Sequence, residues 1–157
     1  MEEEYQSIEE IEEYSINTFG IIQKILCSHQ QINYAKAMGI GTFLRGVPHL
    51  IRKGINPGLP RDLTQRYDVN LEDDHGSWSS KLSLLVQELS NIAIYNIIQA
   101  SNSKIDSVYM LQMVGIIGYL NRLQQQHYKI EKTDTRNNAE LMLKMLKTRY
   151  LGFKINK

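Results

Sequence analysis

The chain has 157 residues, enough for one domain of ordinary size but not for two. Hydrophobic residues make up 42% and charged residues 22% of it, with only 3 Pro and 10 Gly. This composition excludes a mainly disordered, collagen-like or low-complexity protein. A single cysteine, Cys27, excludes an internal disulfide framework and a multi-cysteine zinc or iron-sulfur site. We therefore expect a single domain over residues 1–157.

The net charge of +1 conceals an uneven distribution of charge along the chain. Residues 2–13 contain seven glutamates and no base, whereas residues 122–157 contain nine bases and three acids. The net charge gives no reason to expect nucleic-acid binding. We interpret these charged segments as solvated helix faces. The alternative is a specific patch that attracts an acidic partner surface or anionic lipid headgroups.

No segment is long and apolar enough to predict a membrane-spanning helix. The longest stretches without Asp, Glu, Lys or Arg are residues 89–103 and 107–121, each of 15 residues. A spanning helix needs roughly 18 apolar residues. The acidic first residues have the opposite charge to a signal peptide or to an Arg-rich transit peptide. A targeting signal for an organelle is therefore expected to be internal, removed by processing or absent from this sequence.

The first predicted helix opens at Ser7, which forms a capping-box pattern with Glu10, and reaches about Ser28. Its apolar stripe is expected to be Ile8, Ile11, Ser15, Thr18, Phe19, Ile22, Ile25 and Leu26.

A second periodic segment, residues 32–51, contains Gly39 and Gly41, which we interpret as sites of close packing with another helix. Pro48 lacks an N–H and crowds the carbonyl four residues earlier, so this helix is expected to kink or end near Val47. A loop over residues 52–60 follows. Pro60 then fits the first position of a short helix that reaches Arg66.

Three more helices are predicted after a turn that Asn70 and Asp73 open and Gly76 ends. The first spans Ser77 to about Ala100 and has an apolar stripe with one polar insertion, Asn96. The second is capped by Ser103 and Asp106, and its largely apolar middle, with residues 108, 110, 111, 114, 117, 119 and 120, predicts a central helix. The third is amphipathic and starts at Thr133 or Asp134. No period-two strand pattern persists, so the sequence predicts an all-α fold.

The sequence offers no clear catalytic, cofactor-binding or metal-binding residues. The four histidines are His29, His49, His75 and His127. None has the i, i+4 spacing of a helical metal site, and His75, beside Asp73 and Asp74, is interpreted as part of a surface turn rather than as a metal ligand. No phosphate-binding or nucleophile motif occurs, and Cys27 is interpreted as a small core residue.

Residues 37–63 (AMGIGTFLRGVPHLIRKGINPGLPRDL) resemble the second aspartate-rich region of the squalene and phytoene synthase family. Leu44 and Arg45 match its L-R pair, while Leu59, Pro60 and Asp62 match its L-P-x-D loop. Residues 8–20 (IEEIEEYSINTFG) are similar to the preceding helix of the family, and residues 68–157 follow its helix order more loosely. The resemblance implies a helical bundle like the C-terminal half of the trans-isoprenyl diphosphate synthase fold.

The enzymes of that family hold Mg²⁺ and a substrate diphosphate with pairs of aspartates four residues apart. The two corresponding positions here are Gly46 and Leu50, neither of which can bind a metal. The family has a tyrosine in the following loop, but the corresponding position here falls among residues 56–58, which are Asn, Pro and Gly. The helix with the other aspartate pair lies outside this sequence. The resemblance therefore implies a protein that is not an enzyme and uses no metal or other cofactor.

The segment L-R-G-V-P-H at residues 44–49 is most similar to a non-catalytic branch of the family that assists mitochondrial respiratory complex I. The resemblance implies a protein on the matrix side of the inner membrane, in peripheral contact with it, acting as an assembly factor or a bound accessory subunit. Arg45 and His49 are expected to fill and cap the former cavity with internal hydrogen bonds, in preference to binding a ligand.

A half-fold leaves apolar helix faces that another chain can cover, so the expected partner is a related family member or a respiratory-complex subunit. Two alternatives remain open. One is a lipid- or isoprenoid-binding module, and bulky side chains packed between the Gly39 helix and the helix at residues 108–120 would count against it. The other is half of a split prenyltransferase whose partner supplies the catalytic aspartates.

Overall fold

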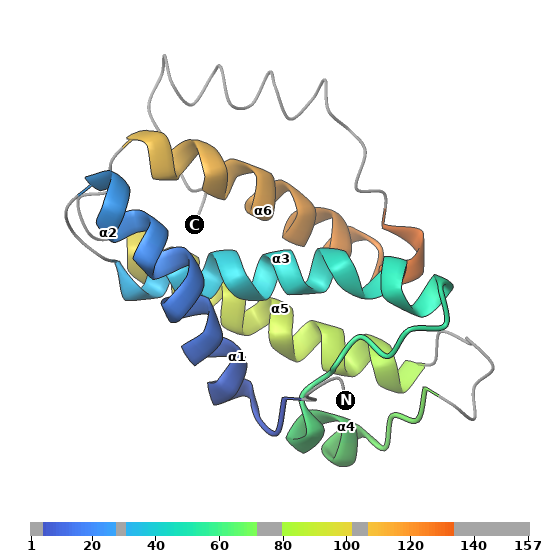
Figure 1. Ribbon diagram of the computed structural model, residues 1–157. Helices are drawn as coiled ribbons and strands as arrows, with labels where there is room; N and C mark the ends of the chain where they lie inside the picture. Colours follow the sequence, from blue (N-terminus) through green and yellow to red (C-terminus); the bar gives the residue numbers. More distant parts are fainter. Residues whose placement is uncertain (1–4, 28–30, 72–79, 102–106, 134–157) are drawn as a thin grey trace.

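The computed structural model describes residues 5–27, 31–71, 80–101 and 107–133, and the predicted all-α fold is confirmed for them (Figure 1). Their elements are α1 (Ile8–Ser15), the π-helical turn η1 (Ile16–Gly20), α2 (Ile21–Cys27), α3 (Ile32–Arg52), α4 (Arg61–Tyr67), α5 (Ser80–Ser101), α6 (Ser107–Gln125) and the 3₁₀ turn η2 (Ile130–Lys132). The predicted turn beyond residue 71, the caps at Ser103 and Asp106, and the last predicted helix lie outside the described residues.

Helix α3 is the central element, and the prediction that α6 would be central is wrong for the described part of the chain. In Figure 1, α3 crosses the middle of the molecule, and it contacts α1, η1, α5 and α6. Two glycines explain this position. A Cβ atom at Gly39 would lie 1.8 Å from Ser15 Oγ on α1, and one at Gly41 would lie 2.3 Å from Ile116 Cγ2 on α6. The predicted close packing at both glycines is therefore confirmed.

Helix α3 continues through Pro48 to Arg52, so of the predicted kink or end near Val47 the end does not occur. Proline removes the N–H that would bind the carbonyl of Leu44, four residues earlier. That carbonyl is buried, and the Tyr119 hydroxyl of α6 donates a hydrogen bond to it over 3.0 Å. Burial raises the pKa of the Tyr119 hydroxyl, which keeps its proton available for donation. The phenol thus replaces the missing intrahelical bond.

The core lies on both sides of α3. A second phenol joins α3 to α6, because the Tyr34 hydroxyl donates to Gln112 Oε1 over 2.5 Å. The largest fully buried side chains are Ile11, Tyr34, Ile40, Leu44, Leu63, Leu85, Leu89, Met113, Tyr119, Leu120 and Leu123.

The first predicted helix is present from α1 to α2, but η1 changes which face of it points inward. A π turn holds one residue more than an α turn, so it rotates the following face of the helix. Gly20, the last residue of η1, and Gln23 after it are buried, while Ile22 and Ile25 of the predicted stripe are 50% and 75% exposed. The prediction for these two isoleucines is wrong for this reason.

The predicted capping box at the start of α1 forms only in part. Ser7 is the N-cap, but its side chain makes no capping bond to the helix backbone. The Glu10 carboxylate accepts the N–H of Gln6 over 2.6 Å instead of that of Ser7. The Ser7 hydroxyl bonds to Glu9 and lowers the pKa of that carboxyl group.

The loop over residues 53–60 agrees with the sequence, and Pro60 is the N-cap of α4 rather than its first residue. The carbonyls of Tyr5 and Gln6 accept the N–H groups of Arg61 and Asp62 over 2.9 and 3.2 Å. These bonds satisfy first-turn amides that a helix cannot satisfy itself. They also fix the segment before α1 against α4.

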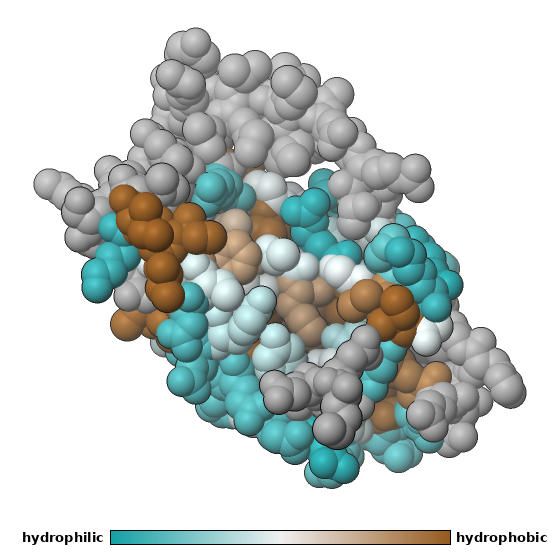
Figure 2. Space-filling view, in the orientation of Figure 1, coloured by the Kyte–Doolittle hydropathy of each residue, from teal (hydrophilic) through white to brown (hydrophobic). Residues whose placement is uncertain are grey.

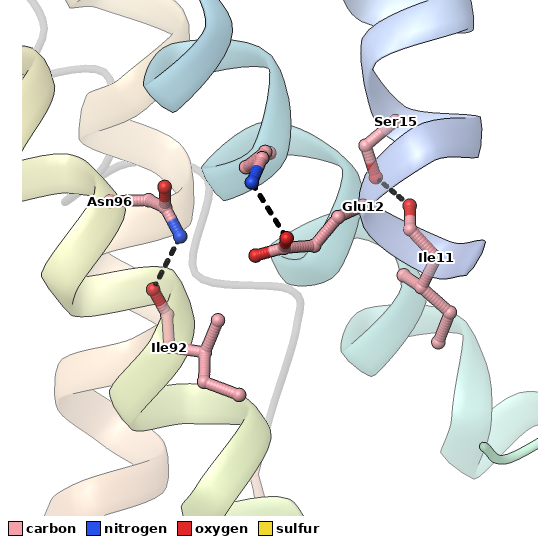
Figure 3. Close-up of polar contacts among 6 residues, drawn as sticks. Ile11, Glu12, Ser15, Ile92 and Asn96 are labelled. Carbon is pink, nitrogen blue, oxygen red and sulfur yellow. Dashed lines mark hydrogen bonds and ion pairs between the residues drawn. The ribbon is translucent and has the colours of Figure 1, made fainter. Parts of the chain in front are cut away.

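Helix α5 confirms the stripe predicted for it. Its buried side chains are Leu82, Leu85, Val86, Leu89, Ser90, Ala93, Asn96, Ile97 and Ala100. The polar insertion is satisfied within the helix, since the Asn96 side-chain amide donates to the Ile92 carbonyl over 2.9 Å (Figure 3). Glu88 on the same helix binds both Arg66 and the Tyr67 hydroxyl of α4, over 2.7 and 2.6 Å.

Replacing Tyr119 with Phe is expected to lower the free energy of unfolding by about 1–3 kcal/mol, because the Leu44 carbonyl then stays buried without its donor. In a Pro48→Ala background the same replacement is expected to cost clearly less, because the alanine introduced there can donate its own N–H to that carbonyl. Urea unfolding of the four proteins in this double-mutant cycle measures the difference. An equal loss of unfolding free energy in both backgrounds would contradict the view that the Tyr119 hydrogen bond replaces the intrahelical bond that Pro48 cannot make.

Candidate binding groove

An open groove of about 360 Å³ lies between α1 and η1 on one side and α3 on the other. Figure 2 views this face of the molecule and shows brown and white surface between α1 and α3, bordered by teal. The groove is lined by Tyr5, Ile11, Tyr14, Ser15, Thr18, Phe19, Gly39, Thr42, Phe43, Gly46 and Leu50.

The α3 wall follows from helical spacing. Gly39, Phe43, Gly46 and Leu50 recur at intervals of four, three and four residues, which places them on one face of the helix. At Gly39 the two helices touch, whereas a Cβ atom at Gly46 would meet no heavy atom within 4 Å. The groove therefore opens along α3 beyond the point where Ser15 and Gly39 pack together.

Aromatic rings form the end of the groove that is nearest to α4. The ring of Tyr5 lies 6.1 Å from that of Tyr14 and 6.1 Å from that of Phe43, and both pairs meet edge to face. Such edge-to-face pairs are favourable ring geometries. Burial, together with the neighbouring Tyr14, raises the pKa of the Tyr5 hydroxyl, so this wall stays uncharged at neutral pH.

Two hydroxyl groups of the wall formed by α1 and η1 donate to the backbone of the same helical segment. Ser15 Oγ donates to the Ile11 carbonyl over 2.6 Å, as Figure 3 shows, and Thr18 Oγ1 donates to the Tyr14 carbonyl over 2.8 Å. Each hydroxyl has only one proton to donate. Because both protons are used within the helical segment, Ser15 and Thr18 offer no donor to an occupant of the groove, which favours an apolar occupant at this part of the wall.

Charge lies beside the groove rather than in it. Glu9, Glu10 and Glu13 are exposed on α1, and Glu12 forms an ion pair of 2.6 Å with Lys36 of α3 (Figure 3). This pair joins the two walls of the groove at a half-buried position. The ion pair therefore helps to fix the separation of α1 and α3, although a pair this accessible contributes at most about 1 kcal/mol.

Gly46 and Leu50, the two positions where the resemblance would place aspartates, both line the groove. Arg45 and His49 are exposed instead, so the expectation that they fill and cap a cavity with internal hydrogen bonds is wrong. A helix turns about 100° per residue. When Gly46 and Leu50 face the groove, the residues before each of them are turned towards solvent.

The cavity does not lie where the sequence suggested. Between α3 and α6 the space is packed with bulky side chains, including Ile116 against Gly41 and Tyr119 against Leu44. Among the side chains that the structure describes, this packing counts against a lipid site between these two helices. The open groove is on the opposite side of α3, and the sequence reasoning missed its aromatic residues. The sequence signal for the α3 wall is the i, i+4, i+7 spacing of Gly39, Phe43 and Gly46, which places these residues on one face of the helix.

The remaining candidates add no site. His49 and His127 are exposed, whereas His29, His75 and the side chain of Cys27 lie outside the described residues. Leu59 and Pro60 are buried, and Asp62 accepts the Leu63 N–H over 2.8 Å at the start of α4.

Within the described residues, no three His, Cys, Asp or Glu side chains are grouped as metal ligands. In the same part of the chain, no helix has the length and hydropathy needed to span a bilayer.

Comparison with protein-family models, with curated proteins and with solved structures finds no match to this chain.

Replacing Gly46 with Ala is expected to raise the free energy of unfolding by up to about 1 kcal/mol, since alanine favours a helix and the groove has room for its Cβ. Replacing Gly39 with Ala is expected to lower it by about 1–3 kcal/mol, because the added Cβ would overlap Ser15. Chemical denaturation compares the two variants. Equal stabilisation of both would show that α1 and α3 are not in close contact at Gly39.

Proposed function

We propose that the protein acts without catalysis and holds an apolar segment of another protein chain in the groove between α1, η1 and α3. The observation that carries the proposal is the nature of the groove walls. They consist of aromatic and aliphatic side chains, two glycines, and hydroxyl groups of which Ser15 and Thr18 already donate within α1 and η1. An open apolar face of this kind is typical of a protein interface.

The size of the groove suits a few side chains of a partner helix. A volume of 360 Å³ is that of about a dozen water molecules at about 30 Å³ each. A few aliphatic side chains at i, i+3 and i+4 positions occupy a comparable space, and helix-in-groove recognition uses such anchors. Beyond Gly39 the α3 wall is open at Gly46, where an added Cβ atom would meet no heavy atom within 4 Å.

We further propose that this partner is a related family member or a subunit of mitochondrial respiratory complex I, on the matrix side of the inner membrane. The support is the sequence resemblance at residues 8–20 and 37–63, which includes likeness to the C-terminal half of the trans-isoprenyl diphosphate synthase fold. In that half-fold, α3 would be the helix that lost its metal-binding acids. Gly46 and Leu50, which replace them, lie in the groove that the partner would cover. The protein would then serve as an assembly factor or as a bound accessory subunit.

A lipid or isoprenoid chain in the same groove is the second candidate. The used hydroxyl protons of Ser15 and Thr18 favour a hydrocarbon as much as they favour a partner's side chains. A split prenyltransferase is less favoured, because none of the residues that line the groove is acidic and the partner would have to supply every carboxylate.

A photo-cross-linking residue at Thr42, an exposed position in the groove, tests these candidates in intact mitochondria. We expect a cross-link to a complex I subunit or to a related family member, identified by mass spectrometry. The same probe at Gln65, exposed on α4 and outside the groove, is the matched control. Cross-links that persist in purified mature complex I would indicate an accessory subunit, and their loss would indicate an assembly factor.

A second variant separates loss of binding from loss of folding. Replacing Gly46 with Leu extends a side chain into the groove from a position where an added Cβ atom would meet no heavy atom within 4 Å, so the fold should remain while the Thr42 cross-link disappears. Circular dichroism and thermal melting verify the fold. Identical cross-links from Thr42 and Gln65, or a Thr42 cross-link that Gly46→Leu leaves unchanged, would refute binding in the groove. If the Thr42 probe forms only adducts with the mass of a lipid, the occupant of the groove is the second candidate, a lipid or isoprenoid chain, and not a protein.

A further inference from the structure

The two helices that form the groove carry charges of opposite sign. Residues 2–13, which include the start of α1, contain seven glutamates and no base, whereas residues 14–61, which include all of α3, contain no Asp or Glu. None of the residues that line the groove carries a formal charge at neutral pH. An occupant therefore meets apolar side chains within the groove, acids on the α1 side and bases on the α3 side.

On α1, an acid and an aromatic ring share the side that borders the groove. Glu10 is exposed and lies four residues before Tyr14, a groove residue that is 55% exposed. Residues four apart lie one above the other on a helix. Glu10 Oε2 accepts the Gln6 N–H, and a carboxylate has further acceptor sites. A lysine or arginine of an occupant can thus pair with Glu10 while it lies over the Tyr14 ring.

On α3, a row of exposed side chains runs beside the residues that line the groove. Thr42, Arg45 and His49 recur at intervals of three and four residues, and Lys53, the C-cap of the helix, follows after four more. This spacing places all four along one side of α3. Because Arg45 and Lys53 are cations, acidic side chains of an occupant would be attracted to this wall.

The two signs favour a helix over a hydrocarbon chain as the occupant. A hydrocarbon has no charges along its length and would use neither wall's charges. A helix can direct apolar anchors into the groove while the residues that flank the anchors reach the charged side chains of α1 and α3. In coiled coils, charged flanks of this kind set the choice and orientation of the partner.

We propose that the partner segment is an amphipathic helix with basic side chains on the flank beside α1 and acidic side chains on the flank beside α3. This inference rests on the proposed function, because it specifies the segment that the groove holds. Reversing such a helix exchanges its two flanks, so it matches both walls in only one direction along α3. The charges therefore select the partner and its direction, while the apolar anchors contribute most of the affinity.

Three synthetic helical peptides with the same leucine anchors test the charge pattern. The mixed peptide carries Lys on one flank and Glu on the other, the second carries Lys on both flanks, and the third carries Glu on both. Fluorescence anisotropy measures the binding of each to the full chain. We expect the mixed peptide to bind about three- to tenfold more tightly at low salt, because each of the others places like charges beside one wall. High salt should reduce this difference.

Variants of the two walls should change the preference in opposite ways. Arg45→Glu adds an acid to the α3 wall, so the advantage of the mixed peptide over the peptide with Lys on both flanks is expected to disappear. Glu10→Gln keeps an acceptor for the Gln6 N–H but removes the charge, so it is expected to weaken binding of the mixed peptide about two- to fivefold.

Lys24→Glu is the matched control, because Lys24 is exposed on α2 and does not line the groove. It changes the net charge by the same amount as Arg45→Glu and should leave the order of the three peptides unchanged. Circular dichroism verifies that each variant folds.

Equal affinities of the three peptides, or an order that Arg45→Glu leaves unchanged, would overturn the charge pattern. If Gly46→Leu abolishes binding that is equal for all three peptides, the groove still holds an apolar segment, and only the charge pattern fails. Binding of none of the peptides would also overturn the pattern, and the Thr42 cross-link would then decide separately on the proposed function.

Discussion

The hydrogen bond from the Tyr119 hydroxyl to the Leu44 carbonyl is the interaction on which the arrangement of the molecule depends. Pro48 would otherwise leave a buried carbonyl without a donor in the middle of the central helix, at a cost of about 1–3 kcal/mol. With that carbonyl satisfied from α6, α3 continues to Arg52. Gly46 and Leu50 then stay on the face that Gly39 and Phe43 begin. The α3 wall of the groove is therefore held in place by a side chain on the opposite side of the same helix.

The two glycines of α3 solve a related problem, which is how one helix can be approached closely from two directions. Gly39 and Gly41 are two residues apart, so they point about 200° apart around the helix axis. One receives Ser15 of α1 and the other receives Ile116 of α6. Close contact at Gly39 also determines where the groove begins, because α1 and α3 can separate only beyond that point. The same small residue thus gives α3 its central position and marks the start of the groove.

The sequence predicts the helices better than it predicts how they contact one another. The stripe of α5, the loop after Arg52 and the close packing at Gly39 and Gly41 follow from local spacing and residue size. The continuation of α3 through Pro48 could not be predicted locally, since the donor is 75 residues away from Leu44. Nothing in residues 16–20 signals a π turn, and the groove needs the relative position of two helices. Residue types alone carry neither kind of information.

The π turn separates two surfaces of different character on one continuous helical segment. Before it, Ile11 and Ser15 face α3 and Tyr14 lines the groove, as does Thr18 within the turn. The last residue of the turn, Gly20, and Gln23 after it are buried, whereas the isoleucines of α2 are exposed. A regular α-helix through residues 16–20 would instead bring Ile22 towards the core and Gln23 towards solvent. It would bury one of the isoleucines of α2 that are now exposed and leave an amide in its place. One extra residue in a single turn therefore lets α1 line the groove while the isoleucines of α2 stay exposed. Because α1, η1 and α2 form one continuous helical segment, a partner held in the groove would keep a fixed orientation relative to these isoleucines.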